Sequence, residues 1–141
     1  MTSGSHSEIV SDWYDVHPIN EQQILEKLAK DNVNLAGLTE DGLQDYDQDP
    51  FGGTEANESL SAAAGIDRTH HVLDVCSGMG GPARYLAHWT GCQVTGLDLT
   101  QSRVDGATRL TAMTGLDASV AFCQGNALAN PFADETFDRV I

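Results

Sequence analysis

The chain has 141 residues, of which 40% are hydrophobic and 20% are charged. This length suits an ordinary globular domain, and no apolar run approaches the roughly 20 residues that a transmembrane helix needs. Twenty-one acidic against seven basic residues give a formal charge of −14. Because nucleic acids and anionic membranes attract basic surfaces, this charge argues against either of them as a partner.

The acidic residues are concentrated in the first half of the chain. Residues 1–66 contain thirteen acidic and two basic residues, whereas residues 67–141 contain eight and five. We interpret the acidic part as a solvated surface, with a cationic ligand or a high-salt source as alternatives. The three cysteines form no CxxC pair and the first twenty residues show no secretory signal. We therefore expect reduced thiols and a cytoplasmic location.

Residues 1–66 are predicted to form an N-terminal cap of helices and loops. Residues 1–19 are polar and are predicted to be loose at the start. Asn20 and Gln23 predict a capping box for a helix over residues 21–30. Residues 31–53 are predicted to be a loop with a turn at 49–53. Thr54 is predicted to cap a second short helix, which ends at Gly65.

From residue 67 onward, short strands and helices are predicted to alternate. Nearly continuous apolar runs predict strands over residues 72–76, 92–99 and 119–123, and the start of a fourth over 137–141. Helices are predicted between them, the first opening at Pro82 and ending at Gly91, the second capped by Thr100 and ending at Gly115. This order predicts an α/β fold, a doubly wound Rossmann-like parallel sheet of strand order 3-2-1-4 that is incomplete in this chain.

Polar and glycine residues follow the predicted strands where such sheets bind ligands, beyond their carboxyl ends. We interpret Gly78 and Gly80, in the turn after the first strand, as leaving room for close backbone approach by a ligand. Asp98 ends the second strand and can accept hydrogen bonds from two ribose hydroxyls. Asn126 follows the third strand and offers a donor and an acceptor to an adenine edge. Together these residues predict a nucleoside site.

Residues 72–80 resemble the first motif of the class I S-adenosylmethionine-dependent methyltransferase family, and residues 94–99 resemble its second motif. Residues 124–127 and 131–138 are similar to its segment leading into the fourth strand. The resemblance implies S-adenosylmethionine as cofactor, with Gly78 and Gly80 beside its methionine portion, Asp98 at the ribose and Leu99 against adenine. The residues that it places at the cofactor are Asp74, Cys76, Ser77, Gly78, Gly80, Asp98, Leu99, Asn126 and Ala127.

Residues 46–53 are similar to a segment of small-molecule methyltransferases that act on amines and related acceptors. This adds Tyr46, which would face the cofactor or anchor its loop. The resemblance thus implies methyl transfer to a small-molecule acceptor, with an amine as a candidate. Two residues depart from the family pattern, since Cys76 stands where glycine is usual and Asn126 where aspartate is usual. No catalytic residue and no metal site is predicted.

Two other functions stay open. Residues 78–83 also fit the G-x-G-x-x-A pattern of an NAD(P)- or flavin-binding oxidoreductase. The chain could equally be a non-catalytic nucleoside-binding or assembly subunit. We interpret residues 67–141 as the first half of a Rossmann-like domain that is truncated in the fourth strand. Because Val140 and Ile141 would leave an apolar edge, we expect the chain to dimerise or associate through it.

Overall fold

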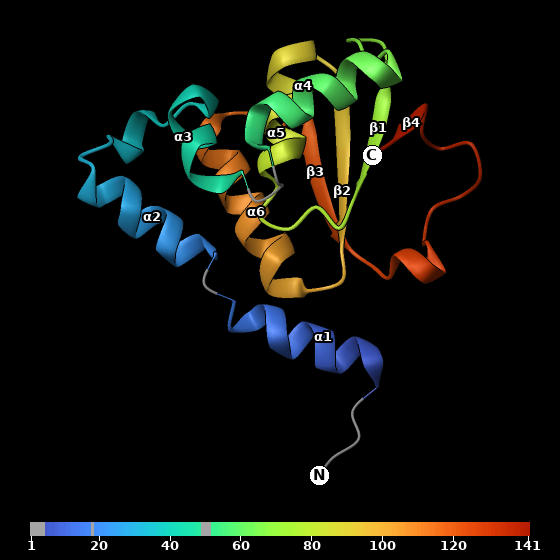
Figure 1. Cartoon of the computed structure of the whole chain (residues 1–141), viewed down its shortest axis with the longest axis horizontal. Coiled ribbons are helices and arrows are strands. Elements are labelled where there is room, and N and C mark those ends of the chain that lie inside the picture. Colours follow the sequence, from blue (N-terminus) through green and yellow to red (C-terminus); the bar gives the residue numbers. More distant parts are fainter. Residues whose placement is uncertain (1–4, 18, 49–51) are drawn as a thin grey trace.

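The computed structural model describes residues 5–17, 19–48 and 52–141. At its centre lies a four-stranded parallel sheet of order β3-β2-β1-β4 (Figure 1), which confirms the predicted topology. The carboxyl ends of β1, β2 and β3 lie level, because Val75 pairs with Leu97 and Leu97 with Cys123. The strands are β1 (His71–Val75), β2 (Gln93–Asp98), β3 (Val120–Gln124) and β4 (Arg139–Val140).

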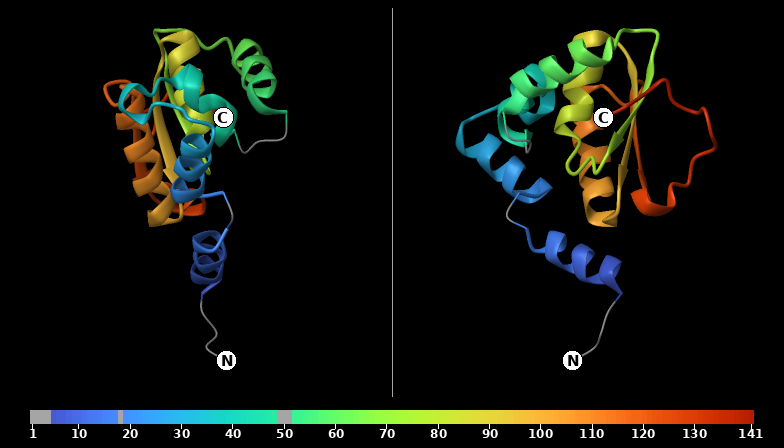
Figure 2. Two further views of the ribbon diagram at one scale, coloured as in Figure 1. Left: turned by 90° about the vertical axis from the view of Figure 1, so that its left-hand side faces the viewer. Right: turned by 45° about the vertical axis from the view of Figure 1, so that its right-hand side comes forward.

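Two helices connect the first three strands and pack on β2 and β3: α5 (Gly81–Thr90) and α6 (Gln101–Thr114). Right-handed crossovers in the same direction bring both to one side of the sheet, as the right-hand view of Figure 2 shows. Gly91 and Gly115 end these helices in the left-handed conformation, as predicted. Thr100 holds the N-cap position of α6, but its side chain makes no capping hydrogen bond.

The N-terminal part contains more helix than we predicted. Its elements are α1 (His6–Asp15), α2 (Glu21–Lys30), η1 (Leu35–Gly37), α3 (Glu40–Asp47) and α4 (Gly53–Ala64). The start of the chain that we predicted to be loose, residues 1–4, lies outside the described residues. Helix α1 was not predicted, and Ser5 and Glu8 form a complete capping box for it. For α2 the structure shows one half of the predicted box, in which Asn20 Oδ1 accepts a hydrogen bond from the Gln23 backbone at 3.0 Å.

The prediction of a loop over residues 31–53 is also wrong. Thr39 accepts a hydrogen bond from the Gly42 backbone and so caps α3, whose Leu43 is fully buried. Burial of Leu43, together with that of Glu40 and Asp47, outweighs the loop-forming composition of the segment. Part of the predicted turn, residues 49–51, lies outside the described residues. Gly52 is the N-cap of α4, so Thr54 lies inside the helix and does not cap it.

Two apolar clusters stabilise the fold. The first joins the sheet to α5 through residues such as Val72, Leu86 and Val94. The second joins α2 and α3 to Met79 and Leu110, which belong to the β1–α5 turn and to α6. Helices α2 and α3 are therefore packed directly against the turn that follows β1. None of the helices in the described ranges is both long and apolar enough to cross a bilayer.

Candidate functional site

The turn between β1 and α5, residues 76–80, is held by the neighbouring strand. The backbone N–H groups of Cys76 and Ser77 both donate to the Leu97 carbonyl, at 2.8 and 3.1 Å. Cys76, Gly78 and Gly80 all have positive φ, with values of 63°, 54° and 79°. A non-glycine residue in this region is strained. Cys76 therefore carries backbone strain at the position where the resemblance expects glycine.

The two predicted glycines serve different purposes. A Cβ atom on Gly78 would meet nothing within 4 Å, so this side of the turn is open to a ligand. A Cβ atom on Gly80 would lie 2.4 Å from the Phe122 ring and 2.9 Å from the Arg84 guanidinium. Gly80 is thus required by internal packing, which corrects our prediction that it makes room for a ligand.

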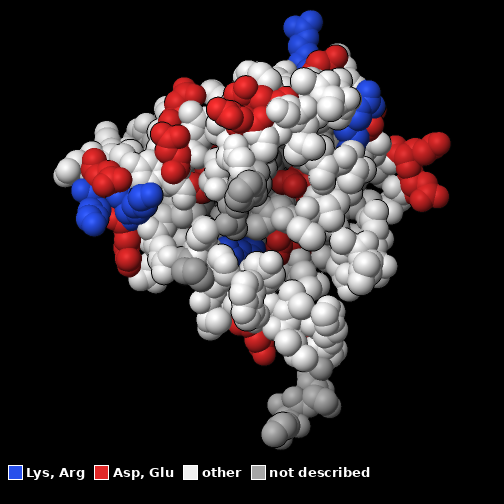
Figure 3. Space-filling view, in the orientation of Figure 1, with Lys and Arg blue, Asp and Glu red and all other residues white. Residues whose placement is uncertain are grey.

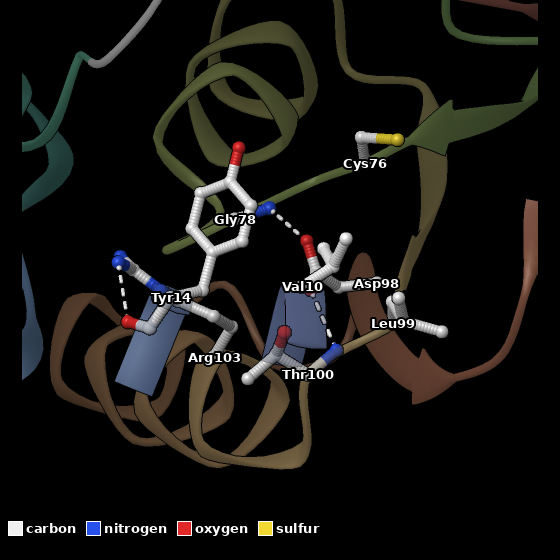
Figure 4. A pocket seen from close by; sticks show the side chains of 8 residues that line it. All are labelled: Val10, Tyr14, Cys76, Gly78, Asp98, Leu99, Thr100 and Arg103. Carbon is white, nitrogen blue, oxygen red and sulfur yellow. Dashed lines mark hydrogen bonds between the residues drawn. The ribbon is translucent and has the colours of Figure 1, made fainter. Parts of the chain in front are cut away.

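Asp98 joins the end of β2 to this turn. Its Oδ2 accepts a hydrogen bond from the Gly78 backbone at 2.8 Å, and its Oδ1 accepts one from the Thr100 backbone at 2.9 Å. The carboxylate is only half-buried and lines a cavity of about 300 Å³. Figure 4 shows the hydrogen bond that joins it to the Gly78 backbone. A partly accessible carboxylate in this place can accept further hydrogen bonds from a ligand.

The first cavity is closed on one side by the N-terminal helix. Val10 and Tyr14 of α1 line it together with Asp98, Leu99 and Arg103 (Figure 4). Arg103 is buried and donates through Nη2 to the Tyr14 carbonyl at 3.2 Å, and its guanidinium lies 5.5 Å from the centre of the Tyr14 ring. Sequence reasoning missed this wall. The only available signal was the Ser5 and Glu8 capping pattern.

A second cavity of about 340 Å³ lies on the other side of the turn and shares Cys76 and Gly78 with the first. Asp74 and Ser77 line it from the β1 side. Asp74 is 7% exposed, and burial, reinforced by the nearby Asp98 carboxylate, raises its pKa to about 7. Burial raises the pKa of the Cys76 thiol, and the Asp98 and Asp74 carboxylates add to this shift. The N-terminal part contributes Asp47, Asn57 and Leu60.

A fully buried arginine connects the N-terminal part with the turn after β1. Arg84 of α5 pairs with Asp47 at the end of α3 and donates to the Met79 carbonyl at 2.9 Å. Glu40 lies 3.4 Å from its Nε. Burial raises the pKa of Glu40 to about 8 although Arg84 opposes this shift. Our sequence analysis missed this cluster, because an arginine on an otherwise apolar helix face was its only signal.

Not all predicted site residues come together. Six line one or both cavities: Asp74, Cys76, Ser77, Gly78, Asp98 and Leu99. Tyr46 is not among the described residues that line either cavity. Its hydroxyl donates to Asp31 at 3.1 Å, and its ring packs with the α2 side chains.

Asn126 and Ala127 do not line the two cavities either. Asn126 caps the short helix η2 (Ala127–Ala129) by accepting a hydrogen bond from the Leu128 backbone at 2.9 Å. It nevertheless lies beside the end of β2, because the preceding Gly125 donates to the Asp98 carbonyl at 2.8 Å. In the described part of the chain, no three His, Cys, Asp or Glu side chains cluster as metal ligands.

The part of the chain that contains the turn and Asp98 matches known proteins. A family model for a methyltransferase domain matches residues 72–141. Methyltransferase GfsG of Streptomyces halstedii is 31% identical over 134 residues, 95% of this chain and 46% of that protein. Sterol 24-C-methyltransferase erg-4 of Neurospora crassa is 38% identical over 81 residues, 57% of this chain and 21% of that protein.

The fold matches as well. A solved S-adenosylmethionine-dependent methyltransferase from Thiobacillus denitrificans, in complex with S-adenosylhomocysteine, is 31% identical with a TM-score of 0.56, covering 66% of this chain and 37% of that one. With its 3-2-1-4 sheet, its glycine turn and the acid that ends β2, the chain belongs to the class I S-adenosylmethionine-dependent methyltransferase family. It spans less than half the length of the curated relatives described above.

Proposed function

We propose that this chain binds S-adenosylmethionine across the two cavities and serves as the cofactor-binding part of a methyltransferase. The observation that carries the proposal is Asp98, a half-buried carboxylate tied to the open Gly78 turn and lining the first cavity. When bound, S-adenosylmethionine supplies an electrophilic methyl group on a sulfonium sulfur. Each cavity is at the small end of the range of about 300–1,000 Å³ for ligand pockets, so an elongated ligand would use both.

The residues present suit the two ends of such a ligand. Asp98 and Leu99 would hold the nucleoside in the first cavity, with Asn126 beside the adenine edge. Asp74, Ser77 and Gly78 would border the methionine portion in the second cavity. The buried Asp74 Oδ2 has no hydrogen-bond partner among the described residues, which favours a ligand donor at this place. We further propose that residues 1–66 cap the site that residues 67–141 build.

The protein's part in the reaction would be to align the methyl donor with an acceptor and to exclude water. We name no catalytic residue, because the acceptor's need for a base depends on its identity. We propose a small-molecule acceptor, with an amine as the first candidate. Acidic side chains are spread over the face in Figure 3, which supports a neutral or cationic acceptor over nucleic acid. We also propose a cytoplasmic location and association through the β4 edge, where Val140 is 63% exposed.

Calorimetry with S-adenosylhomocysteine and with NAD tests the proposed cofactor. We expect S-adenosylhomocysteine to bind and NAD not to bind; preferential NAD binding would favour the oxidoreductase alternative. Asp98→Ala should weaken S-adenosylhomocysteine binding by about 1.5–3 kcal/mol, because it removes charge-assisted hydrogen bonds. The matched control is Asp105→Ala on the exposed face of α6, which should leave binding unchanged.

Methyl transfer to amines and to RNA, screened with the complete protein, tests the acceptor. Activity on small amines supports the proposal, and activity confined to RNA contradicts it.

A further inference from the structure

One buried arginine and two buried carboxyl groups lie together beside the turn of residues 76–80. Arg84 is 0% exposed, and Glu40 and Asp47 are each 2% exposed. The two acids stand seven positions apart on α3, so two helical turns bring both of them to Arg84. With both carboxyl groups ionised, two negative charges would be buried against one positive charge, which is costly. One bound proton makes the cluster neutral.

The hydrogen bonds indicate which carboxyl group favours the proton. Asp47 Oδ2 accepts a hydrogen bond from Arg84 Nη2, whereas Glu40 Oε2 lies 3.4 Å from Arg84 Nε. Neither Glu40 oxygen and not the Arg84 Nε has a hydrogen-bond partner among the described residues. A buried carboxylate without hydrogen bonds is poorly stabilised, so Glu40 is the group that favours its neutral form.

The charges around Glu40 agree with this order. Burial raises the pKa of Glu40 to about 8; the Arg84 guanidinium opposes this shift, and the Asp47 and Asp41 carboxylates add to it. Burial also raises the pKa of Asp47, but the charge of Arg84 and its hydrogen bond oppose that shift. Glu40 is therefore the member of the cluster that titrates near neutral pH.

Other charged groups on the helices packed on α3 make contacts of their own. His88 of α5 lies 3.1 Å from Asp41 at the surface. From α2, Lys27 lies over the Tyr46 ring, and Asp31 accepts a hydrogen bond from the Tyr46 hydroxyl. The protonation of the cluster therefore depends chiefly on its own three members and on Asp41.

Arg84 connects the cluster to the turn that borders both cavities. Its Nη2 donates to the Met79 carbonyl at 2.9 Å, and its Nη1 would lie 2.9 Å from a Cβ atom on Gly80. The same Nη1 donates to the Ala107 carbonyl and to Thr111 Oγ1 of α6, at 3.2 and 3.0 Å. A movement of the guanidinium must therefore be followed by the turn.

We infer that Glu40, acting through Arg84, makes the binding of the cofactor depend on pH. Neutral Glu40 leaves the guanidinium to Asp47 and to the Met79 carbonyl, which keeps the turn in place. Ionised Glu40 competes for the same guanidinium, draws it away from the Met79 carbonyl and loosens the turn. The inference rests on the proposed function. Glu40 and Arg84 are positioning residues in it, because they act on the cofactor only through the turn.

Calorimetric titration with S-adenosylhomocysteine at pH 7 and at pH 9 tests the inference. It compares the unaltered chain with Glu40→Gln, which stays neutral at both pH values. The neutral form of Glu40 falls from about 90% to about 10% of the molecules, so the affinity of the unaltered chain relative to the variant should fall about three- to tenfold. Titration of Asp74 and of the ligand's amino group cancels in this ratio, since both proteins share it. A ratio that changes less than twofold overturns the inference.

Two control variants remove neighbouring titratable groups at the surface. Asp41→Asn and His88→Gln alter a contact that lies beside the cluster without including Glu40 or Arg84. Both should retain the pH dependence of the unaltered chain, and its loss in both would overturn the assignment to Glu40. Circular dichroism at each pH checks that all the proteins are folded.

If Glu40→Gln does not fold, Glu40→Met takes its place, because methionine is uncharged and of similar length. Failure of the proposed function has a different signature, since the unaltered chain would then bind S-adenosylhomocysteine at neither pH. Binding with the same pH dependence in the unaltered chain and in the Glu40 variant overturns the inference alone.

Discussion

Residues 71–141 and residues 5–48 contribute to the cavities in different ways. The first region supplies a turn and strand ends whose residues follow one another in a short motif, from Asp74 to Gly78 and at Asp98. The second supplies single side chains from short helices, such as Tyr14 and Asp47. The residues that the first region contributes are close together in the sequence. Those of the second region are positioned by long-range contacts such as that of Arg84 with Asp47, 37 positions apart. The comparison predicts that contacts between the regions matter most for stability.

The largest expected effect is that of Arg84→Met. It leaves Asp47 as a buried carboxylate without its partner, which should lower the free energy of unfolding by about 3–5 kcal/mol. Arg109→Met is the matched control, because Arg109 also joins the two regions, through Glu21, but its side chain is 58% exposed. That change should cost only about 0–1 kcal/mol. Urea denaturation measures both, and equal effects would show that burial does not set the strength of the contact.

Gly81→Ala tests the backbone contact between the regions. The new methyl group would stand 2.2 Å from the Asp47 carbonyl oxygen, so α3 must shift, at an expected cost of about 1–3 kcal/mol. Gly42→Ala in α3 is the control, since its methyl group would meet only ordinary contacts at 3.7 Å. A helical Gly→Ala change should stabilise by about 0.5–1 kcal/mol. Destabilisation by both variants, measured by urea denaturation, would contradict the importance of this contact.

The pH dependence of stability tests one buried carboxyl group in each region, Glu40 and Asp74. Burial raises the pKa of Glu40 from 4.5 to about 8 and that of Asp74 from 3.8 to about 7. At a pH between the ordinary and the raised pKa of each carboxyl group, that group is protonated in the folded protein but ionised in the unfolded chain. The free energy of unfolding should therefore fall as pH rises from about 5 to 8, by up to about 1.4 kcal/mol per pH unit for each proton.

Glu40→Gln should flatten this fall, most clearly near pH 8, where Asp74 has lost most of its proton whereas Glu40 is still titrating. Denaturation midpoints across the pH range supply the measurement. Stability that rises over this range would show that the two carboxyl groups are ionised in the folded protein.

The smallest effect concerns the first region alone. Cys76→Gly removes the strain of a non-glycine residue at φ 63° and should stabilise the protein by about 1 kcal/mol. Asn32→Gly, at φ 59° in the N-terminal region, should change stability less, because asparagine tolerates this conformation. A rise in the urea midpoint for Cys76→Gly but not for Asn32→Gly is the expected result. Destabilisation by Cys76→Gly would mean that the thiol contributes packing that outweighs the strain.

The parallel sheet could be predicted because its signals are local. Apolar runs of five or six residues, separated by helices that end at Gly91 and Gly115, define the βαβαβ order, and right-handed crossovers favour the order 3-2-1 for its strands. The place of β4 beside β1 was expected from the family resemblance. The glycine turn and Asp98 follow from the same order, since they directly succeed β1 and end β2. By contrast, α3 was missed because its composition resembles a loop, and the burial of Leu43 and the pairing of Asp47 with Arg84 stabilise it as a helix.

What the sequence determined by itself is thus the sheet, its topology and the half of the site that lies at strand ends, because neighbouring residues and backbone geometry suffice for these. Only the tertiary structure decided that Gly80 serves packing against Phe122, that Tyr46 lies with α2, and that Tyr14 and Asp47 reach the cavities. These placements depend on side chains far apart in the chain meeting in a shared core. No local pattern encodes such a meeting, since the energy comes from burial and ion pairing across the assembled fold.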